Sequence, residues 1–231
     1  MEEKKHHNNL NKTFARRIGK SLSDTDKRVL DNVLPKYLYA ANNFASSTCK
    51  AKYLEIGFGM GEHFVHQVKS NPEALYIGAE VYLNGVARVL KQLQNSKDCH
   101  FMLWPDDIDL VLTKMPPSSL DGIYILFPDP WHKRKYLKKR LLNQERLESI
   151  KDKLKPGGFL SFASDIEDYF SSVIQLFEVD QDLEIATRTY LIPHSGYIQT
   201  KYHQKAIKEG RTPKFITAIR LEKPGKKYLF A

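Results

Sequence analysis

The sequence predicts an α/β fold in which helices flank an open, mostly parallel β-sheet with an antiparallel C-terminal hairpin. Short apolar runs alternate with segments of helical spacing along most of the 231 residues, which is the element order of a parallel sheet. Several of these runs end in a carboxylate, at the sheet edge where such folds bind ligands. Two late segments, 183–190 and 215–221, show β-branched alternation and predict the hairpin.

The first predicted strand leads into the turn that organises the site. Residues 52–56 are an apolar run with Glu55 near its end, and Gly57, Gly59 and Gly61 follow at alternate positions. Glycines in such a turn allow positive φ and let a ligand approach without Cβ atoms in the way. We therefore predict a ligand bound against bare backbone. The G-x-G-x-G spacing differs from the dinucleotide fingerprint, so the turn alone does not identify that ligand.

A second carboxylate narrows the ligand class. The run 75–79 predicts a strand that ends in Glu80, about 20 residues after the glycines, where nucleotide-binding folds hold a ribose diol. This position predicts an adenosine cofactor but leaves open which one. The alternative is a solvated acid at the end of a strand.

The third predicted strand, 99–103, also leads to acids. Asp106 and Asp107 follow it, and an aspartate there is a suitable acceptor for the exocyclic amine of adenine. Spacing does not decide between the two aspartates. We favour Asp107, because it directly precedes the helix-like segment 108–112.

The fourth predicted strand, 120–127, leads to the candidate catalytic group. It runs into Pro128-Asp129-Pro130, where two prolines give one carboxylate a rigid mount. In an open parallel sheet, Asp129 stands at the mouth of the same crevice as the glycine turn. The alternative is a proline-rich turn with an incidental acid.

A dense basic segment follows this acid. Only two of the residues 133–140 are uncharged, and a cation cluster beside a reaction site favours an anionic macromolecule as substrate. A solvated charged face is the alternative. Trp131 and Tyr136 are candidates for stacking on an unpaired base, although Trp131 would serve equally well in core packing. The predicted RNA contacts in the segment are Lys135, Lys138, Lys139 and Arg140.

The other predicted elements complete the sheet and its cover. A helix begins near Ser23 and carries an apolar face as far as Pro35, and a second helix spans 85–93. A leucine-rich amphipathic helix then leads to a Lys-Pro-Gly-Gly turn and the strand 159–165. The polar, basic segment 196–214 is predicted to be a long loop of functional or mobile character.

Composition bounds the remaining properties. The balance of 42% hydrophobic and 27% charged residues indicates a soluble globular protein. The formal net charge of +9 suggests a polyanionic partner, and a generally basic, soluble surface is the alternative. We expect residues 1–20 to form a flexible basic segment and residues 21–231 a single domain. No apolar run reaches the roughly 18 residues of a membrane helix, and no hydrophobic signal core opens the sequence. We therefore expect a cytoplasmic protein without membrane contact.

The cysteines and histidines do not form a metal-binding pattern. Cys49 and Cys99 lack ligand spacing and are expected to be reduced thiols. His63 and His66 have the i, i+3 spacing of a ligand pair, but no third ligand is apparent, and we expect both on an ordinary helix surface. The oligomeric state stays open between a monomer and a homodimer.

Together these motifs resemble a known family. They are the glycine turn after Glu55, the acid Glu80, the Phe-Pro-Asp-Pro-Trp stretch at 127–131, the Lys-Pro-Gly-Gly turn at 155–158 and Ser164-Asp165. From about Phe14 to its end the chain resembles the bacterial tRNA (guanine-N7)-methyltransferase family, often called TrmB, and the Phe-Pro-Asp-Pro-Trp stretch is the specific part. The resemblance implies a Rossmann-like class I methyltransferase fold, S-adenosylmethionine as methyl donor, and N7 of the guanosine at position 46 in the variable loop of tRNA as acceptor.

The resemblance also implies residue roles. Glu55, Glu80 and Asp107 would bind the cofactor together with the three glycines, and Asp129 would be the catalytic or substrate-orienting acid. The implied substrate contacts are Lys133, Asp165, Thr200, Lys201, Tyr202 and His203. The last four depart from the family's usual Thr-Lys-[Phe/Tyr]-Glu, because a histidine stands where the family has an acid.

Two other functions fit parts of the pattern. Methyltransferases of exocyclic amines carry an [Asp/Asn]-Pro-Pro-aromatic motif, which Asp129-Pro130-Trp131 approaches with one proline missing. A non-catalytic RNA-binding module with a degenerate cofactor pocket is the second alternative. Mapping of the methylated atom separates the first from N7 methylation, and equilibrium binding of S-adenosylmethionine tests the second.

Overall fold

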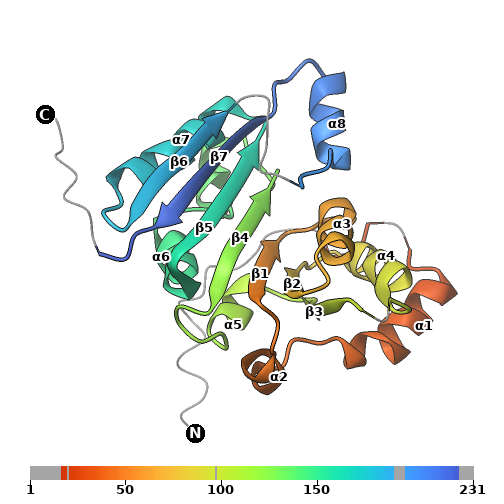
Figure 1. Cartoon of the computed structure of the whole chain (residues 1–231). Coiled ribbons are helices and arrows are strands. Elements are labelled where there is room, and N and C mark those ends of the chain that lie inside the picture. Colours follow the sequence, from red (N-terminus) through yellow and green to blue (C-terminus); the bar gives the residue numbers. More distant parts are fainter. Residues whose placement is uncertain (1–16, 20, 97, 190–195, 224–231) are drawn as a thin grey trace, which may run out of the picture.

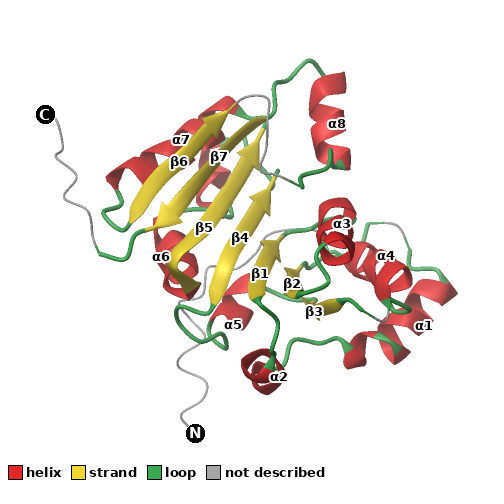
Figure 2. Ribbon diagram, in the orientation of Figure 1, coloured by secondary structure: helices red, strands yellow, loops and turns green. Residues whose placement is uncertain are grey.

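In the described part of the chain, seven strands form one sheet with helices packed on both faces (Figures 1 and 2). The computed structural model describes residues 17–19, 21–96, 98–189 and 196–223. Most of the predicted N-terminal segment lies outside these residues. So does Tyr190, at the end of one predicted hairpin strand.

The order of the strands determines where a ligand can bind. It runs β3-β2-β1-β4-β5-β7-β6, with parallel pairing from β3 to β5 and antiparallel pairing of β7 with both β5 and β6. The predicted fold class is thereby confirmed. Because the chain leaves the neighbours β1 and β4 in opposite directions along the sheet, their carboxyl ends form a topological switch point. The strands are β1 Ala51–Ile56, β2 Ala74–Ala79, β3 His100–Trp104, β4 Leu120–Leu126, β5 Leu154–Ser164, β6 Leu183–Thr189 and β7 Lys214–Arg220.

Two helical layers cover the sheet. Helices α1, α3 and α4 contribute to one hydrophobic cluster, and α2, α5, α6 and α7 contribute to the cluster on the other face (Figure 2). The α-helices are α1 Asp24–Asn32, α2 Ala41–Ser46, α3 Glu62–Ser70, α4 Leu83–Leu93, α5 Ile108–Leu112, α6 Gln144–Lys153, α7 Glu167–Val179 and α8 Lys201–Lys208, and the 3₁₀-helices are η2 Leu34–Lys36 and η3 Arg134–Lys139.

Side-chain caps set the starts of two predicted helices. The Ser23 side chain accepts from the Asp26 N–H at 3.1 Å, and the Asp26 side chain accepts from the Ser23 N–H at 3.3 Å, which is a capping box at the start of α1. Asn143 accepts from the Arg146 N–H at 3.0 Å and starts α6. The predicted amphipathic helix therefore begins after Asn143.

The prediction of a long loop at 196–214 is wrong, because this segment contains α8. The Thr200 side chain caps the helix by accepting from the His203 N–H at 3.2 Å. His203 and Ala206 are its buried residues. Two buried positions in eight residues give too little apolar periodicity for the helix to be detected from the sequence.

The Lys-Pro-Gly-Gly segment is an irregularity inside β5. Leu154 pairs with Leu120 and Phe159 pairs with Gly122, so β5 advances five residues while β4 advances two. Gly157 takes a φ of 79° within this bulge. A Cβ at Gly122 would come within 2.2 Å of the Phe159 ring, so glycine is required where the ring crosses β4.

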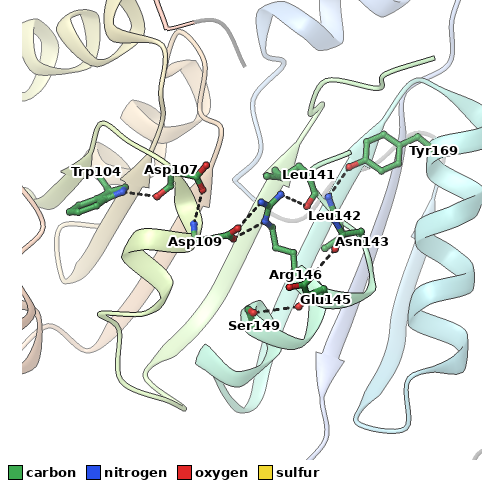
Figure 3. A network of polar contacts seen from close by, with 10 residues as sticks. All are labelled: Trp104, Asp107, Asp109, Leu141, Leu142, Asn143, Glu145, Arg146, Ser149 and Tyr169. Atoms are coloured by element: carbon green, nitrogen blue, oxygen red, sulfur yellow. Dashed lines mark hydrogen bonds and ion pairs between the residues drawn. The ribbon is translucent and has the colours of Figure 1, made fainter. Parts of the chain in front are cut away.

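A buried ion pair ties α5 to α6 (Figure 3). Arg146 Nε donates to Asp109 Oδ1 at 2.8 Å, and Arg146 Nη2 donates to Oδ2 at 2.9 Å, which is bidentate geometry. Arg146 Nη1 also donates to the Leu141 carbonyl at 2.9 Å. Because both ionic side chains are buried, removal of one partner leaves the other charge without its bidentate counter-ion.

Replacement of one partner of this pair is expected to destabilise the fold. Asp109→Ala should lower the free energy of unfolding by about 3–5 kcal/mol, because it removes the bidentate carboxylate from a buried guanidinium. The double variant Asp109→Leu with Arg146→Met should lose less, since no charge is left behind. Urea denaturation monitored by circular dichroism measures both losses.

An exposed ion pair provides the control. Glu73→Ala removes the surface contact with Lys50, whose loss should cost about 0–1 kcal/mol. If Asp109→Ala lowered the free energy of unfolding no more than Glu73→Ala does, the buried pair would not stabilise the fold more than an exposed one.

Candidate active site

A cavity of about 480 Å³ opens at the carboxyl ends of β1, β2 and β4, at the switch point of the sheet. Its walls come from the glycine turn, from Glu80, from the residues after β4, from Gly19 and from α8. The cavity therefore joins the turn after β1 to the acid after β4. The predicted site residues that line it are Gly57, Gly59, Glu80, Asp129, Lys139, Lys201 and Tyr202.

The glycines of the turn have different roles. Gly57, Gly59 and Gly61 have φ values of 74°, 56° and 78°, a region that residues with side chains avoid. A Cβ at Gly57 would meet no protein atom within 4 Å, whereas a Cβ at Gly61 would lie 2.2 Å from Cγ2 of Val89 on α4. Gly57 thus leaves backbone open at the cavity, and Gly61 lets the start of α3 approach α4.

Glu80 fastens the glycine turn to the end of β2. Its Oε2 accepts from the Gly59 N–H at 2.6 Å, and its Oε1 accepts from the Tyr82 N–H at 2.8 Å. Burial raises the pKa of Glu80, and the hydrogen bonds from Tyr82 and Gly59 oppose that rise. Each carboxylate oxygen has a second lone pair, so Glu80 is still able to accept from a ligand hydroxyl.

Glu55 points away from the cavity into a buried polar network. Its neighbour Ile56 lines the cavity, and strand alternation sends Glu55 to the opposite face. Glu55 Oε2 lies 2.8 Å from His63 Nδ1, and the network continues through Gln67 to the Gly196 carbonyl. His63 is 1% exposed, so the prediction that it lies on a helix surface is wrong. The Glu55 carboxylate supports the turn from behind.

The two aspartates after β3 have separate positions. Asp107 caps α5 by accepting from the Asp109 N–H at 3.0 Å, and its carbonyl accepts from Trp104 Nε1 at 2.8 Å (Figure 3). Asp106 lines the cavity, and its Oδ1 accepts from Arg17 Nη1 at 3.1 Å. Asp106 is therefore the more direct neighbour of a ligand, while the choice between the two for adenine remains a prediction.

Residues 127–131, called here the Asp129 corner, present one carboxylate to the cavity. Phe127 and Trp131 have φ values of 52° and 45°, so two residues with large side chains adopt the left-handed region. Pro128, Asp129 and Trp131 line the cavity wall. The surrounding protein displaces water and raises the pKa of Asp129. The corner is a strained backbone with an acid at its centre.

The basic segment after the corner combines cations with aromatic rings. Lys139 Nζ lies 4.5 Å from the centre of the Tyr136 ring and 5.0 Å from that of Trp131, and the two rings meet edge to face at 5.9 Å. This arrangement puts a cation and two aromatic side chains beside the Asp129 corner. The exposed lysines of the segment are Lys133, Lys135 and Lys138.

Arg140 differs from the other cations of the segment. It is 7% exposed. Its Nε donates to the Pro130 carbonyl at 2.9 Å, and its Nη2 donates to Asp168 Oδ2 at 2.6 Å. Two of its donors therefore have partners within the protein, and the RNA contact of Arg140 stays a prediction.

Helix α8 covers one side of the cavity, beyond the tips of β4 and β5 (Figure 1). Lys201, Tyr202 and Lys205 line the cavity. The Tyr202 ring lies over the glycine turn, 3.3 Å from where a Cβ of Gly59 would be. The ring centres of Phe127 and His203 lie 5.8 Å apart, so α8 packs against the Asp129 corner and brings two cations and a phenol to the cavity beside it.

The other predicted substrate contacts hold α8 and its surroundings in place. His203 is 6% exposed, and its Nδ1 lies 2.9 Å from the Tyr197 hydroxyl. Burial lowers the pKa of His203 and favours the neutral ring. Asp165 is paired with Arg211, just after α8. Thr200, as the helix cap, also supports rather than lines the cavity.

The described residues show neither a metal-binding cluster nor a membrane-spanning helix. Among them, no group of three or more histidine, cysteine, aspartate or glutamate side chains is arranged to hold a metal ion. None of the helices described is both long enough and apolar enough to cross a membrane.

The chain is similar in sequence to known methyltransferases. A family model described as "Putative methyltransferase" matches residues 50–216. The tRNA (guanine-N(7)-)-methyltransferase of Bartonella quintana is 34% identical over 220 residues, which covers 90% of this chain and 94% of that protein. The chain belongs to the tRNA (guanine-N7)-methyltransferase family.

Other members of this methyltransferase group are longer. The "Bifunctional methyltransferase" of Rickettsia conorii is 56% identical over 209 residues, which covers 90% of this chain but 40% of that protein. The chain therefore spans less than half the length of this relative. Among solved structures, the 16S rRNA (adenine(1408)-N(1))-methyltransferase from Catenulisporales acidiphilia superposes with a TM-score of 0.55 at 16% identity, over 80% of this chain and 94% of that one. This likeness concerns the class I methyltransferase fold.

Sequence reasoning missed several wall residues of this family member. Lys205 stands one helical turn after Lys201, a spacing that indicates a shared face once α8 is known. Gly19 and Arg146 also line the cavity. Neither carries a local signal, because each reaches the cavity through packing of distant segments.

Substitution of the turn glycines should separate backbone strain from steric overlap. Gly57→Ala should cost about 1–2 kcal/mol of stability, since only the left-handed conformation opposes it. Gly61→Ala should cost about 1–3 kcal/mol more, because the new Cβ also overlaps Val89. Equilibrium unfolding in urea measures the difference. Equal losses for the two variants would show that α4 can move to accommodate the methyl group.

Proposed function

We propose that this chain transfers a methyl group from S-adenosylmethionine to N7 of guanosine in tRNA, at position 46 of the variable loop. Membership of the tRNA (guanine-N7)-methyltransferase family supports the reaction class. The observation that carries the proposal is the shared cavity, in which the glycine turn and Glu80 stand beside Asp129. A methyl donor and a base acceptor must meet in one such space.

The cavity suits an adenosine cofactor with a cationic sulfur. Gly57 offers backbone that no Cβ covers, and Glu80 has lone pairs for ribose hydroxyls. Asp106 or Asp107 would accept from the adenine amine. Glu55 would act through the buried support that it gives to the turn. S-adenosylmethionine, when bound, supplies a methyl group on a sulfonium that leaves as a neutral thioether.

Asp129 would orient the acceptor. N7 of guanine carries a lone pair and no proton, so the transfer requires no strong base. The Asp129 carboxylate would accept hydrogen bonds from the Watson–Crick edge of guanine and turn N7 toward the methyl group. Its negative charge would also offset the positive charge that develops on the ring. The strained backbone of the corner limits the positions that this carboxylate can take.

The basic segment and α8 would bind the RNA backbone. The lysines of both elements lie beside the cavity or on the adjoining surface, and the chain has a net charge of +9. Trp131 or Tyr136 would stack on the acceptor base or its neighbour. Thr200 and His203 would contribute by holding Lys201 and Tyr202 at the cavity. We also propose that Lys133 and Asp165 contact the tRNA substrate.

Nucleoside analysis tests this function directly. Total tRNA without modifications is incubated with labelled S-adenosylmethionine, and the product is digested and separated. Labelled N7-methylguanosine, with cleavage of the RNA by borohydride and aniline, is expected. Label on an exocyclic amine would assign the chain to the alternative methyltransferase class. Cofactor binding without transfer to any tRNA would instead favour a non-catalytic module.

Loss of the Glu80 carboxylate should weaken cofactor binding. Glu80→Ala removes the acceptors for the ribose and for the Gly59 and Tyr82 amides, so the Kd for S-adenosylmethionine should rise by about 10-fold or more. Glu80→Gln should have a smaller effect, since one acceptor oxygen remains. Isothermal titration calorimetry measures both. An unchanged Kd in Glu80→Ala would refute the ribose role.

Loss of the Asp129 carboxylate should affect turnover and leave cofactor binding nearly unchanged. Asp129→Ala is expected to lower kcat by about 100-fold or more, because the base loses its orienting acceptor. The Kd for S-adenosylmethionine should stay within a few fold. A large rise in that Kd would place Asp129 in the cofactor half of the cavity. Single-turnover methylation and calorimetry on the same preparation make the comparison.

A further inference from the structure

The Asp129 corner contains backbone that must be held in place from outside. Phe127 and Trp131 both adopt the left-handed region, which is unfavourable for residues with large side chains. Such conformations persist where the surrounding structure fixes them. Two prolines between them have no N–H, so the corner supplies few donors of its own.

The two ends of the corner are held by different groups. At the first end, the Phe127 N–H donates to the Ala163 carbonyl at 2.8 Å, which extends the sheet. At the second end, Arg140 Nε donates to the Pro130 carbonyl at 2.9 Å. This carbonyl belongs to the peptide that precedes Trp131. The hydrogen bond therefore fixes the peptide plane about which the strained φ of Trp131 is set.

The guanidinium also contacts two residues of α7. Arg140 Nη2 donates to Asp168 Oδ2 at 2.6 Å, and its Cζ lies 4.6 Å from the centre of the Tyr169 ring. Tyr169 is fully buried, and its hydroxyl accepts from the Leu142 N–H at 2.9 Å (Figure 3). Arg140 thus connects the corner to α7 through the exposed carboxylate of Asp168 and the buried ring of Tyr169.

The same bond closes a loop. Pro130 and Arg140 are ten positions apart, and the intervening residues include the exposed lysines of the basic segment. One guanidinium therefore joins the residue next to Asp129 to the end of the basic segment. Arg140 is 7% exposed, whereas an arginine that binds phosphate needs donors that face solvent.

We propose that Arg140 is a positioning residue for methyl transfer, which fixes the Pro130 carbonyl and thereby directs Asp129 toward the acceptor base. This rests on the proposed function. Arg140 acts through the corner and makes no contact with RNA phosphates.

Two substitutions at Arg140 separate positioning from phosphate binding. Arg140→Met preserves the packed stem and removes the donors, and Arg140→Lys preserves the charge without the planar fork. Both should lower single-turnover kcat on the order of 10- to 100-fold, as expected for a small misplacement of a reacting group. The Kd for S-adenosylmethionine and the salt dependence of tRNA binding should stay unchanged. Guanidinium ions added to Arg140→Ala should restore part of the rate.

An exposed neighbour provides the matched control. Lys138→Met should act mainly on the KM for tRNA and lower the salt slope by about one unit, as for the loss of one phosphate contact. The proposal is overturned if Arg140→Met behaves like Lys138→Met, or if Arg140→Lys retains full kcat.

A milder variant covers the case in which Arg140→Met does not fold. Asp168→Asn removes the anionic partner of the guanidinium and should lower kcat by a smaller factor, with the same salt slope as the wild type. An unchanged kcat in Asp168→Asn then counts against the proposal. If the wild-type chain itself makes no N7-methylguanosine, the proposed function fails and the role of Arg140 fails with it.

Discussion

The site depends on the parallel pairing of β1 with β4. Ile56 and Ile125 lie opposite each other at the ends of these strands, so the residues that follow each strand start side by side. The chain then turns toward β2 from one strand and toward β5 from the other. Because the two paths diverge, no connection fills the space between them. The glycine turn and the Asp129 corner face each other there as a consequence of strand order.

Buried polar contacts hold the loops around this space. The contact of Glu55 with His63 supports the glycine turn. The pair of Asp109 with Arg146 joins α5 to α6, and Arg140 donates to the carbonyl of Pro130. In each case the charged or polar group faces protein and not the cavity, except that Arg146 also lines the wall. Buried ionic groups are costly unless paired in good geometry. These pairs therefore favour one arrangement of the loops over others.

Much of this architecture could be predicted from the sequence, because strands buried on both faces are continuous apolar runs and glycines mark the turn. The shared cavity also followed from the acids at successive strand ends. The individual side-chain contacts could not be predicted from the sequence. Arg140 is the last of several adjacent cations, and nothing in their spacing distinguishes the buried one. His63 is matched to Glu55 across a strand, a turn and the first turn of a helix, which periodicity does not report.

The short segment before α1 encloses the cavity on one side. Gly19 forms part of its wall, and Arg17 is joined to Asp106 by an ion pair whose side chains are about half exposed. Exposed ion pairs hold weakly, typically about 0–1 kcal/mol. The Arg17 carbonyl also accepts from the Leu83 N–H at 2.8 Å, and the Gly19 N–H donates to Asn84 Oδ1 at 3.2 Å. Polar contacts thus hold this side of the cavity. Because the ion pair of Arg17 with Asp106 is exposed, added salt weakens it more than the buried pairs on the other sides of the cavity.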